Sequence, residues 1–263
     1  MNRKSFLSTT ALAALGLSLG GWRFPKKTHF LTLSFDDGFK KSFYRVAEIH
    51  EYYGLKACFN VIATGHFPTF NRDPKWMPRE ILGDFDDWNK LASRGHELMP
   101  HTWEHLNLTE VPVNLAKENI DKCLDYFEQN LDGYDPAYAV YNFAYNASTP
   151  ELEQYCLKRV AAIRTGGWLF MNQRANPFPA PPQNLRLGAW GHGPDNCDDY
   201  LEEEIQAFLQ TEGGWLVLNL HGLDGEGWGP VSPGYLDGLL KRMVQHAAVA
   251  VLPAGEMVKA LQD

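Results

Sequence analysis

The sequence LTLSFDDG, residues 31–38, decides how this chain is interpreted. An apolar, β-prone run ends abruptly in two carboxylates and a glycine. Such a run is typical of a buried strand in an α/β fold, and the residues after its carboxyl end lie at one rim of the sheet. Asp36 and Asp37 are therefore expected to project into a cleft at that rim, with Gly38 permitting the turn. The alternative is an ordinary strand-to-helix turn in which an Asp caps the next helix.

Two neighbouring carboxylates repel each other, so both stay ionised only when a positive charge lies beside them. The Asp36-Asp37 pair thus predicts a nearby cation, supplied by a side chain or by a metal ion.

Strand and helix patterns alternate along the rest of the chain. The first strand, the helix at 40–53 and the strand at 57–62 form a βαβ unit, which predicts a parallel pair with a right-handed crossover. The alternation continues without a break in composition and predicts one α/β domain, a barrel. Strands are expected at 29–35, 57–62, 96–99, 137–143, 160–163, 214–220 and 248–252, and helices at 40–53, 84–94, 113–130, 150–158, 199–210, 233–246 and 256–261. Residues 170–184, rich in Pro and Asn, are interpreted as an excursion from the domain.

Charge and composition exclude some classes of partner. The net charge of −8 argues against a nucleic acid or an anionic membrane, because phosphate binding needs a basic surface. A length of 263 residues with 44% hydrophobic residues provides a sizeable core.

The N-terminus has the features of an export signal. Arg3 and Lys4 precede a small apolar run that is too short for a comfortable transmembrane anchor. The order of residues 3–7 is similar to a twin-arginine signal with Lys in place of the second Arg, which leaves the export route open. We therefore expect a signal at 1–21, a single domain at 22–263, a periplasmic or extracellular location and no stable membrane insertion after removal of the signal.

The four cysteines do not predict a zinc site, because they are far apart and form no C-x-x-C motif. In an exported protein they could pair in three ways, and the sequence favours none of them.

Two histidines predict a metal site. His101 and His105 are four residues apart, a spacing that would place both imidazoles on one face of a helical turn. They follow a predicted strand, as the two aspartates do, and strand ends in a parallel barrel face one rim. Two His and one Asp would leave positions open for water and substrate. The alternative is a pair of histidines with ordinary hydrogen-bond partners. A third strand end carries His221.

With these motifs in place, the chain resembles the polysaccharide deacetylases of the NodB type, carbohydrate esterase family 4. The matching segments are SFDDG at 34–38, HTWEH at 101–105 after GHEL at 95–98, and the apolar strand at 215–220 that ends in His221. The resemblance spans nearly the whole mature chain. It implies a distorted, TIM-barrel-related (β/α) barrel of about seven strands.

The resemblance also implies a set of roles. Asp37, His101 and His105 would hold a divalent metal, with Zn²⁺ the first choice and Co²⁺, Ni²⁺ or Mn²⁺ as alternatives. Asp36 would be the general base that activates a metal-bound water, and His221 the general acid. A metal cation lowers the pKa of its water and polarises an acyl carbonyl, while a departing amine needs a proton.

The third motif of the family departs from its pattern here. Where relatives have Arg-x-Pro followed by an aromatic residue, the matching stretch at 141–146 reads YNFAYN, in which the aromatic survives as Tyr145 but neither Arg nor Pro is present. The fourth motif, an Asp-Trp pair, has no clear match in 166–199. Arg164 ends the neighbouring predicted strand and could supply the missing guanidinium to Asp36. The alternative is a surface Arg that closes a strand.

Aromatic residues in predicted loops suit sugar rings, although Trp also fills protein cores. We expect Tyr145, Trp103 and Trp228 to contact substrate, because the two tryptophans lie closest to motif histidines in the sequence.

The favoured hypothesis is an exported, metal-dependent hydrolase that removes acyl groups, above all N-acetyl, from an acetylated carbohydrate. The alternatives are hydrolysis of a small cyclic amide or imide on the same fold, and a carbohydrate-binding domain that has lost catalysis. The altered third motif motivates the last of these.

Overall fold

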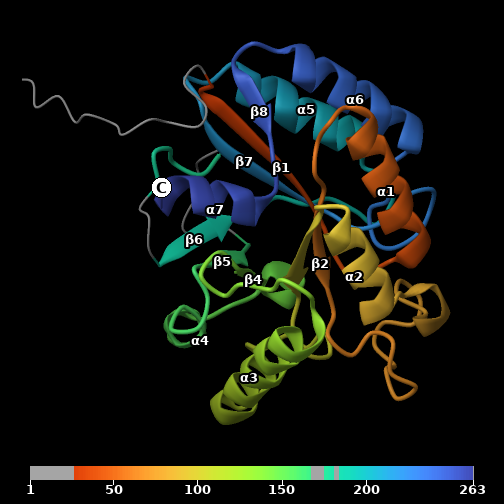
Figure 1. The fold of residues 1–263 in the computed structure, drawn as a ribbon, viewed down its shortest axis with the longest axis vertical. Coiled ribbons are helices and arrows are strands. Elements are labelled where there is room, and N and C mark those ends of the chain that lie inside the picture. The colour runs from red at the N-terminus through yellow and green to blue at the C-terminus, as the bar shows by residue number, and fades with distance from the viewer. Residues whose placement is uncertain (1–26, 167–174, 181–183, 263) are drawn as a thin grey trace, which may run out of the picture.

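The computed structural model describes residues 27–166, 175–180 and 184–262. The expected export signal at 1–21 lies outside the described residues. Strands and helices alternate as the sequence predicted (Figure 1). The strands are β1 (His29–Phe35), β2 (Cys58–Val61), β3 (Glu97–Pro100), β4 (Val140–Asn142), β5 (Ala162–Thr165), β6 (Leu185–Gly188), β7 (Gly214–Leu220) and β8 (Val249–Val251). The α-helices are α1 (Lys40–Tyr52), α2 (Phe85–Ser93), α3 (Val113–Asn130), α4 (Pro150–Cys156), α5 (Asp198–Leu209), α6 (Pro233–Gln245) and α7 (Ala254–Gln262), with short 3₁₀ turns η1 (Arg79–Ile81) and η2 (Ala144–Asn146).

The described strands form two parallel sheets, with β1 at the centre of the larger one. The order in that sheet is β3-β2-β1-β7, and β8 also pairs with β1. The whole of β1 pairs with β7, from His29 opposite Gly214 to Phe35 opposite Leu220. On its other edge, β8 pairs with the first half of β1 and β2 with the last two residues. The smaller sheet has the order β4-β5-β6.

The two sheets approach each other at both edges. On one side, the backbone of Trp190, just after β6, accepts from Asn219 at 2.7 Å and donates to Val217 at 3.1 Å. On the other side, Asn142 on β4 donates its side-chain amide to the Pro100 carbonyl of β3 at 3.3 Å. Strands β1 to β7 therefore follow one another around a distorted barrel, which confirms the predicted fold class. Within the described residues no backbone ladder joins β3 to β4.

Two local predictions were wrong. Strand β6 was not predicted, because LRLG is four residues long and follows a segment rich in Pro and Asn. The segment that carries His101 and His105 is not a helical turn. Thr102 and His105 have φ values of 66° and 56°, and the Thr102 and Trp103 carbonyls accept from Ala63 and Thr64 of the β2 loop instead.

The inner faces of the strands change character along the barrel. Near the amino ends, Phe30, Cys58, Val140, Ala162 and Trp215 form a buried apolar cluster, and residues of α7 pack against it. Because side chains alternate with a period of two, the next inward position on several strands lies closer to the carboxyl end. Those positions are buried and polar: Thr32, Ser34, Asn60, Asn142, Arg164 and Asn219.

The outer faces of the strands are covered by helices (Figure 1). Leu31, Leu33 and Phe35 of β1 belong to a large buried cluster with residues of α1, α2, α3, α5 and α6. Both faces of β1 are thus buried, which explains its strongly β-prone sequence. None of the helices in the described part of the chain is long and apolar enough to span a membrane. All four cysteines are buried free thiols.

The hydroxyl of Thr32 connects β1 to β7 and to the residue that follows β8, which gives a test of the fold. It accepts from the Trp215 indole of β7 at 2.9 Å and donates to the Leu252 carbonyl beyond β8 at 2.9 Å. In Thr32→Val both groups lose their partner, and each unsatisfied buried group costs roughly 1–3 kcal/mol. We expect urea denaturation to show a loss of about 2–4 kcal/mol in the free energy of unfolding.

Thr32→Ser is the matched control, because it keeps the hydroxyl and loses one methyl group. It should cost only about 1 kcal/mol. Equal losses in the two variants would contradict the proposed role of the hydroxyl.

Candidate metal centre

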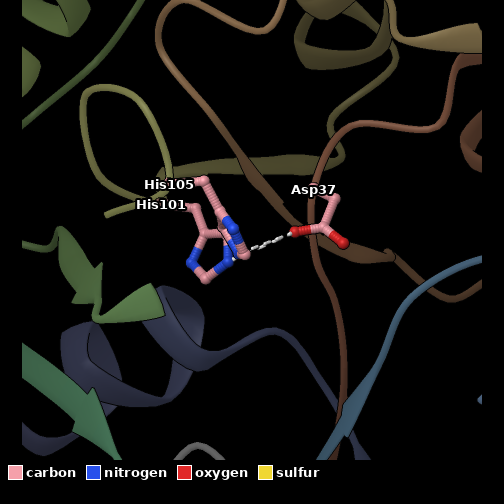
Figure 2. A group of neighbouring side chains, drawn as sticks. All are labelled: Asp37, His101 and His105. Carbon is pink, nitrogen blue, oxygen red and sulfur yellow. Dashed lines mark ion pairs between the residues drawn. The ribbon is translucent and has the colours of Figure 1, made fainter. Parts of the chain in front are cut away.

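Three buried side chains from two strand ends converge at the carboxyl rim of the barrel (Figure 2). Asp37 follows β1, and His101 and His105 lie in the loop after β3. The Nε2 atoms of both histidines lie 3.4 Å from Oδ1 of Asp37. One potential ligand atom from each residue lies within 4.8 Å of the other two. Asp37 has a φ of 77° and Gly38 a φ of 99°, so the turn depends on left-handed backbone as expected.

These residues fit a divalent cation. Oδ1 of Asp37 is buried and has no hydrogen-bond partner among the described residues, although buried carboxylate oxygens are normally paired. Nδ1 of His101 contacts the Asn142 carbonyl at 2.9 Å. That contact fixes the tautomer with hydrogen on Nδ1 and leaves the Nε2 lone pair facing Asp37. Two imidazoles and one carboxylate form a donor set that suits Zn²⁺ and similar ions.

The two histidines differ in their electrostatic setting. Burial lowers the pKa of His105 to about 4, in spite of the Asp37 carboxylate, so this imidazole is neutral and able to donate a lone pair. Burial also acts on His101, but Asp36 and Asp37 outweigh it and raise the pKa of His101. For Asp37 the neighbouring imidazoles, His101 first, outweigh burial and lower the pKa of the carboxyl.

Asp36 is surrounded by hydrogen-bond donors. Arg164 donates from Nη1 to Oδ1 at 2.8 Å and from Nη2 to Oδ2 at 2.5 Å. Asn60 donates to Oδ1 at 2.7 Å, and Asn219 donates to Oδ2 at 2.7 Å. Both Asp36 and Arg164 are almost completely buried. The Asp36 carboxylate therefore receives four hydrogen bonds, which is about its full capacity as an acceptor.

The pKa of Asp36 lies well below its ordinary value. Burial alone would raise it, but the charge and hydrogen bonds of Arg164, together with nearby His101, outweigh burial. Asp36 is thus anionic under all ordinary conditions. The cation that the adjacent aspartates were expected to need is present beside Asp36.

Arg164 reaches Asp36 from the strand beside the altered third motif. In the register of β4 and β5, Arg164 lies directly opposite Asn142, which belongs to the altered motif at 141–146. Its Nη1 also donates to the Ser34 hydroxyl at 2.9 Å. The contact with Asp36 that the sequence suggested is present, and the alternative of an exposed surface Arg does not hold.

The site opens into a cavity of about 430 Å³ at the rim. The aspartates, both histidines of the loop, His221, Tyr145 and Trp228 line it. Trp103 does not. It lines a separate hollow with Phe67 and packs edge-on against Phe67 and Tyr126. Of the expected substrate-contacting residues, the cavity therefore brings together Tyr145 and Trp228 only.

The site also contains residues that the sequence patterns did not indicate, among them Asn60, Asn219, Asp73 and Trp76. Asn60 and Asn219 are single amides inside the apolar runs CFNVI and WLVLNL, and Asn219 lies two residues before His221. The period of two could have placed both on the inner face. Asp73 and Trp76 lie in the long loop after β2, where no periodic pattern in the sequence indicates which side chains face the site.

The chain belongs to the polysaccharide deacetylase family, whose sequence model matches residues 24–157. The matched segment contains Asp36, Asp37, His101 and His105, whereas Arg164 and His221 lie beyond it. No curated protein sequence matches the chain.

Solved structures of the same family share the fold. A candidate polysaccharide deacetylase from Mycobacterium smegmatis is 12% identical with a TM-score of 0.65, and the match covers 90% of this chain and 91% of that one. The peptidoglycan deacetylase PdaC from Bacillus subtilis is 18% identical with a TM-score of 0.52, over 88% of this chain and 92% of that one. BA3943 from Bacillus anthracis, a pseudoenzyme of carbohydrate esterase family 4, is 14% identical with a TM-score of 0.55, over 89% of this chain and 66% of that one.

The Asp36–Arg164 pair should stabilise the folded protein by an amount that depends on pH. In Arg164→Met the anion stays buried without its cation, which typically costs about 3–5 kcal/mol. Because the pKa of Asp36 is depressed in the folded protein, the pair stabilises above the unfolded-state pKa, and this contribution is lost as the pH falls. The deficit of the variant should be largest at pH 7 and smaller near pH 4, because burial without the guanidinium raises the pKa of Asp36 in the variant, so that its carboxyl group takes up a proton there.

Urea denaturation of the metal-free proteins at both pH values measures this deficit. Arg164→Lys, which keeps the charge without the paired N–H groups, should lie between the wild type and Arg164→Met. A deficit that is independent of pH would mean that packing, and not charge, explains the loss.

Proposed function

We propose that this protein is a metal-dependent hydrolase that removes acyl groups, above all N-acetyl, from a carbohydrate. One observation carries the proposal: Asp37, His101 and His105 meet in a single cavity with Asp36, His221 and three aromatic side chains. Membership of the polysaccharide deacetylase family supports the class of reaction.

Asp37, His101 and His105 would hold the cation, with Zn²⁺ as the first choice. When bound, a divalent cation supplies a Lewis acid that polarises the acyl carbonyl and makes water a better nucleophile. The protein contributes a buried, rigid donor set, in which the Asn142 carbonyl orients one imidazole.

Asp36 is proposed as the general base that takes a proton from the attacking water. It lies beside the donor set, since its Oδ2 is 3.6 Å from Nε2 of His101. Arg164 would act as a positioning residue that keeps the carboxylate ionised and aimed at the cavity. To accept a proton, Asp36 has to weaken one of its four hydrogen bonds, and the neutral amides of Asn60 and Asn219 hold it less strongly than Arg164 does.

His221 is proposed as the general acid. It lines the cavity at the end of β7, and its Nδ1 is buried without a hydrogen-bond partner in the described part of the chain. The departing amine of an amide is a poor leaving group and needs a proton, which an imidazole can give. The rings of His221 and Trp228 are nearly perpendicular to each other, with centroids 5.7 Å apart.

Aromatic walls suit a sugar ring. Tyr145 is 54% exposed, and Trp228 and Trp76 line the same cavity. Faces of this kind stack on the apolar faces of pyranose rings, while the polar rim can bind hydroxyl groups. The proposed substrate is therefore an acetylated carbohydrate.

The proposed location is periplasmic or extracellular. It rests on the sequence of residues 1–21 as an export signal, with residues 22–263 as one catalytic domain. The acidic net charge agrees with a neutral carbohydrate partner and not with a nucleic acid.

A carbohydrate-binding domain without catalysis is the second candidate. The four donors on Asp36 favour it, because a carboxylate with a strongly depressed pKa is a weak proton acceptor. BA3943, which shares the fold, is described as a pseudoenzyme. The presence of His221 together with the three-residue donor set favours the hydrolase, since binding alone requires neither.

Acetate release separates the two candidates. Purified protein is incubated with a panel of N- and O-acetylated oligosaccharides, with a chelator and with Zn²⁺, Co²⁺, Ni²⁺ or Mn²⁺ restored after chelation. The hydrolase proposal predicts release that the chelator abolishes and one of these ions restores. Binding of an oligosaccharide without acetate release under any of these conditions would support the second candidate.

The two adjacent aspartates should differ when each is changed to Asn. Asp36→Asn should retain metal and lose at least about 100-fold in turnover, because an amide cannot take the proton. Asp37→Asn should weaken metal binding itself, because it replaces an anionic ligand with a neutral one. Metal content is measured by elemental analysis and turnover by acetate release.

Asp36→Asn also removes the anion from Arg164, so thermal denaturation is needed to show that the variant is folded at the assay temperature. Equal loss of metal in the two variants would reject separate roles for the aspartates.

A further inference from the structure

The loop between β2 and α2 forms one wall of the cavity. Asp73, Trp76 and Met77 of this loop line the cavity. The loop is anchored by a small buried cluster in which Phe70, Met77 and Leu82 pack against Phe39 and Ile62. The loop is therefore held in place by buried residues that precede and follow Asp73 in the sequence.

The two histidines of the metal centre differ in the hydrogen bonding of Nδ1, the ring nitrogen that faces away from Asp37. Nδ1 of His101 is satisfied by the Asn142 carbonyl at 2.9 Å. Nδ1 of His105 is buried and has no hydrogen-bond partner among the described residues. If Nε2 of His105 binds a cation, Nδ1 carries a hydrogen that needs an acceptor.

Asp73 supplies a carboxylate on that side of His105. Its Oδ2 lies 3.8 Å from Nδ1 of His105, slightly beyond hydrogen-bond distance. The same oxygen accepts from the Tyr145 hydroxyl at 2.5 Å, and the Tyr145 and His105 rings lie 4.7 Å apart. His105 is thus flanked by Asp37 at Nε2 and by Asp73 at Nδ1.

The backbone at these positions is strained. Asp73, His105 and Tyr145 have φ values of 40°, 56° and 56°, in the left-handed region that residues other than Gly seldom adopt. Three such residues in mutual contact indicate that the geometry is maintained at an energetic cost, as is common at functional sites.

We propose that Asp73 is a positioning residue for the metal ligand His105. Its carboxylate accepts the Nδ1–H of His105 when Nε2 holds the cation, and the Tyr145 hydroxyl holds the carboxylate in place. The contact fixes the tautomer of His105 and ties the β2–α2 loop to the metal centre. This inference rests on the proposed metal site.

Asp73 is not expected to be a direct ligand. It lies outside the group of donors that come within 4.8 Å of one another, and its side chain is 43% exposed. Carboxylates behind a metal-bound imidazole typically change metal affinity about 10–100-fold when they are removed.

Metal affinity is the direct test. Metal-free protein is titrated with Zn²⁺ against a competing chelator for the wild type, Asp73→Ala, Asp73→Asn and Tyr145→Phe. We expect Asp73→Ala to raise the Kd about 10–100-fold, because it removes the acceptor. Asp73→Asn, which keeps an oxygen and tolerates the left-handed backbone, should have a smaller effect, and Tyr145→Phe should raise the Kd less than Asp73→Ala.

Asp132→Asn is the matched control, because it neutralises an exposed carboxylate after α3, away from the cavity. Hydrogen exchange gives a second readout that a merely structural role would not alter: Zn²⁺ should protect the amides of residues 70–77 in the wild type and not in Asp73→Ala. The Co²⁺ absorption spectrum should keep the intensity of the wild type, since the ligand number is unchanged.

Two results would overturn the inference in distinguishable ways. Tight Zn²⁺ binding by the wild type with an unchanged Kd in Asp73→Ala would reject the role of Asp73 and leave the proposed function intact. Failure of the wild type to bind any divalent ion would reject the metal site and the role of Asp73 together.

Discussion

The buried ion pair between Asp36 and Arg164 is the interaction on which the site depends. It joins the end of β1 to β5, and so connects the two sheets across the interior of the barrel. A buried carboxylate is costly unless it is paired and fully hydrogen-bonded, and Asn60 and Asn219 complete the set of donors. This pairing allows a second carboxylate, Asp37, to lie next to Asp36 and remain available to a cation.

The inner faces of the strands explain how the barrel tolerates so much buried polarity. Apolar side chains near the amino ends pack against α7, and the polar side chains gather one or two inward positions further along. These polar groups satisfy one another: Ser34, for example, accepts from both Asn60 and Arg164. The interior therefore changes from a packed core to a polar layer, and the cavity lies above that layer. All parallel strands of the barrel end at the same rim. One or two polar residues near the carboxyl end of each strand are therefore enough to build the site.

Much of this could be predicted from the sequence because the strongest signals are local. The run before Asp36 and Asp37 and the run before His221 are long, apolar and β-prone, so both the strands and the polar residues that follow them at the rim were recognisable. The short strand β6 was not, since four residues carry too little periodicity. The spacing of His101 and His105 predicted that the two imidazoles lie near each other, and they do, but a turn with left-handed backbone, and not a helix, brings them together. Asp73 could not be found in this way, since its position depends on how a long loop packs against distant residues.

The most direct test of this account is a crystal structure of the Zn²⁺-loaded protein, with the metal located by its anomalous scattering. We expect one ion bound by a carboxylate oxygen of Asp37 and by Nε2 of both His101 and His105. Asp36 should remain paired with Arg164 and outside the ligand set. A metal bound elsewhere, or bound by Asp36 with Arg164 displaced, would contradict the account.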